Sequence, residues 1–66
     1  MTITLNGDVV PLDGASTVAD LIAARYADRR GLAVAVDHTV VPRDSWDSCV
    51  LAPGQRVDVV TAVQGG

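Results

Sequence analysis

The residues with the clearest chemical potential are the two glycines at the end of the sequence, Gly65 and Gly66. Glycine has no Cβ, so such an ending is thin enough to enter a narrow channel in another protein and to place the Gly66 carboxylate at a reactive centre there. A carboxylate is a poor electrophile, and ATP-dependent formation of an acyl-adenylate gives it a better leaving group. We therefore expect a partner enzyme to adenylate Gly66, after which a sulfur or nitrogen nucleophile attacks the carbonyl carbon.

The other reactive side chains lack the companions that a catalytic or metal site needs. His38 has no second histidine, cysteine or carboxylate at zinc-ligand spacing. Cys49 has no paired base, and Ser45 and Ser48 lack the glycines of a nucleophile elbow. We expect Cys49 to be a partly buried structural residue. The chain is thus predicted to be a carrier and not an enzyme, with no bound metal or cofactor; the ATP is used by the partner enzyme.

Length and charge restrict the function further. Sixty-six residues make one domain, residues 1–66. The net charge of −3, from eight Asp and five Arg, argues against a nucleic-acid partner, because phosphate binding needs a basic patch. No charged-then-apolar leader opens the chain, and no apolar run approaches the ~20 residues that span a bilayer, so we expect no membrane contact. A single cysteine fits a reducing compartment, and we expect a cytoplasmic protein.

The first strands and the helix follow from local patterns. Apolar and polar residues alternate from Thr2, and Asn6-Gly7 is a hairpin turn signal, so a second strand is expected over residues 8–12. Pro11 cannot donate a hydrogen bond, which places that strand at an edge. Ser16 or Thr17 is expected to cap a helix with one apolar face. We expect that helix to approach the arginines at positions 29 and 30, with Gly31 as its C-terminal cap.

The second half of the sequence predicts three more strands. They cover residues 33–36, residues 40–41 after a tight turn at Asp37-His38, and residues 55–62. The last strand is apolar on both faces toward its end, so we place it in the middle of the sheet. The helix lets the first and last strands become parallel neighbours. The fold is thus predicted to be α+β, a β-grasp with a mixed sheet of about four to five strands on one main helix, and residues 64–66 form a flexible tail.

Three segments of the chain resemble the ThiS family, the sulfur carrier proteins of thiamine biosynthesis. They read "STVADLI", "VAVDHTVVPRDSW" and "LAPGQRVDVVTAVQGG". The most specific parts are Val41-Pro42-Arg43 followed by Trp46, and the ending at residues 62–66. The sequence differs from the residues that are common in the family at three loop or strand-edge positions, Asp37, Asp44 and Gln55.

The resemblance implies a cycle of sulfur transfer. An E1-like enzyme of the ThiF type adenylates Gly66, and the adenylate becomes a thiocarboxylate with sulfur from cysteine by a cysteine desulfurase route. The thiocarboxylate then donates sulfur to a thiazole synthase of the ThiG type. Gly65, Gln64 and Val63 would thread into the partner sites.

Candidate partner contacts are Val60, Ala62, Arg43 and Trp46. For Trp46 two interpretations stay open, a cap on the small core or an exposed hot spot. Arg43 either pairs with partner carboxylates or is solvated. Three other functions stay open for the whole chain: a sulfur carrier for molybdopterin or cysteine synthesis, a ubiquitin-like protein modifier, and a plain interaction domain with an inert tail.

Overall fold

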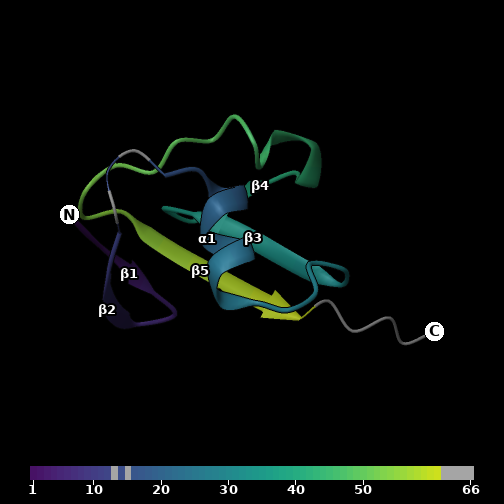
Figure 1. The fold of residues 1–66 in the computed structure, drawn as a ribbon, viewed down its shortest axis with the longest axis horizontal. Helices are drawn as coiled ribbons and strands as arrows, with labels where there is room; N and C mark the ends of the chain where they lie inside the picture. The colour runs from purple at the N-terminus through teal and green to yellow at the C-terminus, as the bar shows by residue number, and fades with distance from the viewer. Residues whose placement is uncertain (13, 15, 62–66) are drawn as a thin grey trace.

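The computed structural model describes residues 1–12, 14 and 16–61, and in them one helix lies across one face of a five-stranded sheet (Figure 1). The strand order is β2-β1-β5-β3-β4. The elements are β1 (Thr2–Leu5), β2 (Asp8–Pro11), α1 (Val18–Arg25), β3 (Leu32–Val36), β4 (Thr39–Val41), the 3-10 turn η1 (Arg43–Ser45) and β5 (Arg56–Thr61). This mixed sheet on one helix confirms the predicted β-grasp.

β5 occupies the centre of the sheet, as its apolar sequence predicts. It runs parallel to β1, where Leu5 lies opposite Val57, and antiparallel to β3, where Leu32 lies opposite Thr61. The edge position expected for the strand that holds Pro11 is also confirmed, because β2 pairs only with β1 among the described strands. The strand that leads into the chain's last residues is therefore held on both sides.

Two tight turns use residues with positive φ. Asn6 and Gly7 have φ values of 49° and 87°, and Asp37 and His38 have values of 49° and 69°. A two-residue hairpin of type I′ needs positive φ at both positions, which glycine, asparagine and aspartate tolerate best. The Asp37 carboxylate stabilises the second turn by accepting hydrogen bonds from Arg56 N at 3.0 Å and from Gln55 Nε2 at 3.1 Å. Two of the positions that depart from the ThiS pattern thus bind each other.

α1 begins as predicted and ends earlier than predicted. Thr17 is the N-cap: its Oγ1 accepts from Asp20 N at 3.1 Å, and Asp20 Oδ2 accepts from Thr17 N at 3.0 Å. Our prediction that the helix approaches residues 29 and 30 is wrong, because Tyr26 already has an extended backbone. The carboxylate of Asp28 accepts from Arg30 N at 2.9 Å, and this local turn competes with a helix. Gly31, with φ of 74°, precedes β3 and does not cap the helix.

The core lies between α1 and the facing side of the sheet. The helix contributes Val18, Leu21 and Ile22, each at most 2% exposed. The sheet contributes the alternate residues that point the same way, and the long segment after β4 adds two more side chains. The buried sheet and segment residues are Ile3, Leu5, Val34, Val36, Val57, Val59, Trp46 and Leu51. In the described part of the chain no helix is long and apolar enough to cross a membrane.

A side chain continues the pairing of β1 with β5 where the β1 backbone turns away. Asn6 N still donates to Val57 O at 2.9 Å. Beyond it, Asn6 Oδ1 accepts from Val59 N at 2.8 Å, and Asn6 Nδ2 donates to Val59 O at 3.2 Å. The Asn6 amide therefore replaces a further strand residue and satisfies both main-chain groups of a buried residue in β5.

This double hydrogen bond predicts a large stability effect at an exposed turn. Asn6→Ala should lower the free energy of unfolding by about 2 to 3 kcal/mol. It leaves the Val59 N–H without a hydrogen-bond partner, and the Cβ of alanine is strained at positive φ. Asn6→Gly relieves the strain and loses the same two bonds, so it should cost less. Urea unfolding followed by circular dichroism measures both. Equal stability of Asn6→Ala and the wild type would contradict the role of the amide.

Candidate functional site

The site suggested by the sequence begins where β5 ends. Thr61 is the last described residue and lies opposite Leu32 of β3. Ala62, Val63, Gln64, Gly65 and Gly66, which carry the predicted contact, threading and adenylation roles, lie outside the described residues, and so does the predicted flexible tail. Five residues can extend no more than about 17 Å, so any chemistry at Gly66 takes place within that distance of the end of β5.

The sheet face opposite α1 carries exposed apolar residues close to this end. Val60 of β5 is 58% exposed and pairs with Ala33, while Val40 of β4 is 70% exposed and pairs with Ala35. Alternation along the strands puts these four residues on one face, and we call them the outer valine patch. The predicted contact residue Val60 is therefore accessible to a partner.

Trp46 belongs to the core, which confirms the first of its two interpretations. Its side chain is 1% exposed, and its Nε1 donates to Val41 O at 3.0 Å. The alternative, an exposed partner contact, is wrong for this side chain, because the ring offers almost no surface. The segment after β4 folds inward through Pro42 and η1, which carries the indole under the sheet's edge.

Two arginines lie over the Trp46 ring. The guanidinium carbon of Arg29 is 5.1 Å from the ring centroid, and that of Arg43 is 5.7 Å from it. Arg43 Nη2 also donates to Arg29 O at 3.5 Å. Arg43 was a predicted contact residue, and it is exposed. Arg29 was assigned only to the helix end, because nothing in its local sequence indicates a tryptophan 17 positions later as its neighbour.

Arg30 turns to a different partner, the carboxylate of Asp28. Arg30 Nη2 lies 2.9 Å from Asp28 Oδ2, and Arg30 Nε donates to both carboxylate oxygens. The hydrogen bonds from the Arg30 side chain and backbone lower the pKa of Asp28 from its ordinary value of 3.8, and the charge of Arg43 acts in the same direction. The same side-chain hydrogen bond raises the pKa of Arg30. Asp28 is thus held in its charged form.

The remaining candidate residues of the sequence stay apart. His38 is exposed in its turn, and Cys49 is a half-buried free thiol. Among the described residues no group of three or more His, Cys, Asp or Glu side chains could hold a metal ion. Two hollows, of about 260 and 350 Å³, border α1, and neither is lined by a histidine or a cysteine.

Comparison with known proteins identifies a family and two similar structures. The sequence profile of the ThiS family matches residues 3–66. The chain belongs to the ThiS family. The crystal structure of the thiamine biosynthesis protein ThiS from Geobacter metallireducens has a TM-score of 0.87 and 26% identity, with 100% of both chains covered. A solution structure of a thiamine biosynthesis protein from that organism has a TM-score of 0.78 and 25% identity, covering 100% of this chain and 88% of the other.

Membership in the ThiS family describes the chain as a small carrier protein of thiamine biosynthesis and not as a catalyst. It also implies interaction with enzymes of that pathway. Among curated proteins no sequence match to the chain is found.

The Asp28–Arg30 pair predicts a change in acid titration. In Arg30→Gln the pKa of Asp28 should rise toward 3.8, because the main cause of its lowering is removed. A lowered folded-state pKa stabilises the fold above the unfolded-state pKa, and this contribution is lost as the pH falls through the folded-state pKa. NMR titration of the Asp28 side-chain carbon measures the shift. Arg56→Gln, which removes an arginine paired with Asp58, is the control and should leave Asp28 unchanged.

Proposed function

We propose that this ThiS family member carries sulfur on the carboxylate of Gly66 for formation of the thiamine thiazole. The observation that carries the proposal is the extent of the family match, which includes the Gly-Gly ending at residue 66. An oxygen of the Gly66 carboxylate attacks the α-phosphate of ATP, and pyrophosphate leaves. The terminal sulfur of a persulfide derived from cysteine then attacks the acyl carbon and displaces AMP. A second thiol cleaves the resulting acyl disulfide by forming a new disulfide, and this releases the thiocarboxylate.

The fold supports this use of the ending. The last residues follow β5, whose end at Thr61 is paired with Leu32 of β3, and the Asn6 amide holds Val59 on the other side two residues earlier. These bonds hold the end of β5 relative to the rest of the surface. A glycine pair after a rigid strand can be threaded into an enzyme while the folded domain stays outside. The enzyme supplies the acid and base groups and the ATP, and the carrier supplies the carboxylate and a surface to recognise.

Two partners follow from the proposal, an E1-like adenylating enzyme and a thiazole synthase. We assign the outer valine patch to the adenylating enzyme, because exposed apolar residues next to the ending provide binding free energy close to the reacting carboxylate. We place the cycle in the cytoplasm, where the free thiol of Cys49 stays reduced.

Deletion of Gly66 tests the chemistry. The full chain, incubated with ATP, cysteine, a cysteine desulfurase and the host's adenylating enzyme, should gain the mass difference between sulfur and oxygen on its C-terminal peptide. The chain without Gly66 should gain nothing and keep the wild-type fold, because the last described strand, β5, ends at Thr61, five residues before Gly66. Intact mass spectrometry and circular dichroism measure the two results.

Three other outcomes would favour a different function or contradict the role of Gly66. Conjugates of raised mass on lysines of other proteins would favour a ubiquitin-like modifier. A thiocarboxylate that relieves a molybdopterin or cysteine auxotrophy, and not a thiamine auxotrophy, would keep the carrier chemistry and change its acceptor. A truncated chain that still supports thiazole formation would remove Gly66 from the mechanism.

The outer valine patch predicts a matched pair of variants. Val60→Asp should weaken binding to the adenylating enzyme by about tenfold or more, because a charge would have to be buried where an apolar contact is lost. Val9→Asp is the control: Val9 is 71% exposed on the edge strand β2, on the other side of the sheet's centre. Titration calorimetry gives both dissociation constants. Equal weakening by the two variants would show that charge, and not the patch, controls binding.

A further inference from the structure

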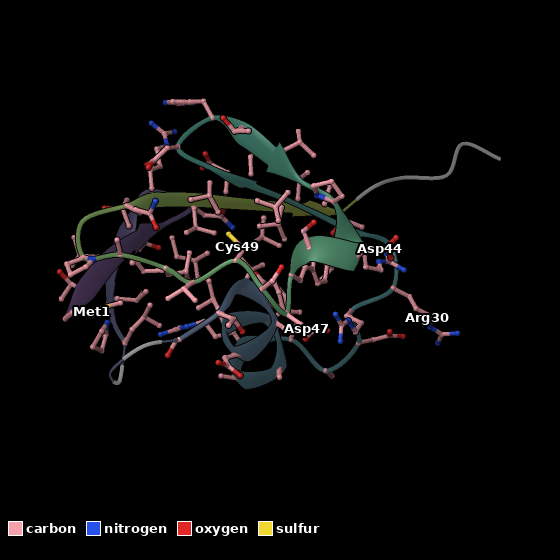
Figure 2. The ribbon with its side chains drawn as sticks, turned by 90° about the horizontal axis from the view of Figure 1, so that it is seen from above. Met1, Arg30, Asp44, Asp47 and Cys49 are labelled. Atoms are coloured by element: carbon pink, nitrogen blue, oxygen red, sulfur yellow. The ribbon has the colours of Figure 1, made fainter. Side chains whose placement is uncertain are left out.

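Three of the chain's five arginines gather at the end of the sheet where β5 ends. The register shows this: Thr61 lies opposite Leu32, which follows Arg30 by two positions, and β4 runs back beside β3 toward Arg43. Figure 2 places Arg30 and Asp44 together at this end of the molecule. We call Arg29, Arg30 and Arg43 the arginine corner.

Two members of the corner have no carboxylate partner among the described residues. Arg30 pairs with Asp28, and the other described ion pair joins Arg56 to Asp58. Arg29 and Arg43 are exposed, and the indole of Trp46 holds both guanidinium groups. Stacking on an aromatic ring uses the face of a guanidinium and leaves its edge for hydrogen bonds. Arg43 Nη2 donates to Arg29 O at 3.5 Å, and the other N–H groups of the two guanidinium groups have no carboxylate partner among the described residues. The arginine corner therefore presents two positively charged groups in defined positions beside the end of β5.

We propose that Arg29 and Arg43 bind carboxylate side chains at the mouth of the channel in the adenylating enzyme that receives the last five residues. The inference rests on the proposed function, since it takes the ending as the part that enters the enzyme. Any protein that accepts the chain beyond Thr61 must approach over this end of the sheet. Guanidinium groups recognise carboxylates through paired hydrogen bonds, which fixes orientation as well as proximity.

Distance separates this role from nucleotide binding. The reacting carboxylate lies at the far end of a segment up to about 17 Å long, so an extended ending carries the ATP well away from the corner. The corner thus faces the protein rim of the channel and not the phosphates at its base. Asp44 lies at this end in Figure 2, and Asp28 lies there through its ion pair with Arg30. Both are exposed, so a partner carboxylate displaced from the two arginines meets negative charge. This arrangement selects one docking register.

Conservative removal of each charge tests the proposal. Arg29→Gln and Arg43→Gln should each raise the dissociation constant for the adenylating enzyme on the order of tenfold and should reduce its dependence on salt concentration. Arg56→Gln is the matched control, because it removes one exposed positive charge at the opposite end of β5. It should change neither quantity appreciably. Thermal unfolding of each variant shows whether the fold is kept.

A second readout separates binding from structural support. Trp46 is the only tryptophan, so a chain labelled with 5-fluorotryptophan gives one ¹⁹F signal that reports on both stacked guanidinium groups. Adding unlabelled adenylating enzyme should shift that signal in the wild type and in Arg56→Gln. Arg29→Lys with Arg43→Lys keeps the charge and loses the paired donors, so it should recover only part of the affinity.

The possible results are distinct. Wild-type binding and salt dependence in Arg29→Gln and Arg43→Gln, together with an unshifted ¹⁹F signal, would overturn the arginine corner and leave the sulfur carrier function standing. Absence of any binding by the wild type, with no gain of sulfur mass, would overturn both proposals. Weakened binding in the two variants with an intact fold and an unaffected Arg56→Gln control would support the corner.

Discussion

β5 is hydrogen-bonded to β1 on one side and to β3 on the other, and the direction in which the chain leaves the fold depends on this double pairing. The Asn6 amide extends it to Val59, beyond the last residue of β1. Val60 and Thr61 pair with β3 alone, so the position of the strand's end depends on the β3 register and on the Asn6 bonds to Val59 just before it. A partner can contact the outer valine patch and the arginine corner while it binds the ending only because the end of β5 has a defined position relative to both.

Much of the fold could be predicted because local and global signals agree. Asn6-Gly7 specifies a type I′ turn, Thr17 and Asp20 specify a helix start, and the apolar end of β5 indicates a central strand. Pro11 excludes a central position for its strand. Each of these is a property of a short segment, and each required no knowledge of the rest of the chain.

The missed features depend on contacts between distant segments. The arginines at positions 29 and 30 and Gly31 suggested a helix longer than α1. In the structure the side chain of Asp28 accepts a hydrogen bond from the backbone of Arg30, and helix-end signals do not predict such a competing turn. The burial of Trp46 depends on how the segment after β4 folds back, so the sequence left two interpretations open. The role of Arg29 could not be predicted, because its contacts with Trp46 and Arg43 exist only in the folded chain. The ending itself was identified from glycine chemistry, without structural information.

The parallel pairing of β1 with β5 joins the first strand to be synthesised with the last. A growing chain on the ribosome cannot complete its sheet until residue 61 has been made, because the central strand is missing before then. The strand that completes the sheet is therefore the last of the described strands to be made. A prematurely terminated copy that lacks β5 would have no stable sheet and would be open to proteolysis. The topology therefore makes the integrity of the whole sheet depend on a strand that is synthesised after both of its neighbours.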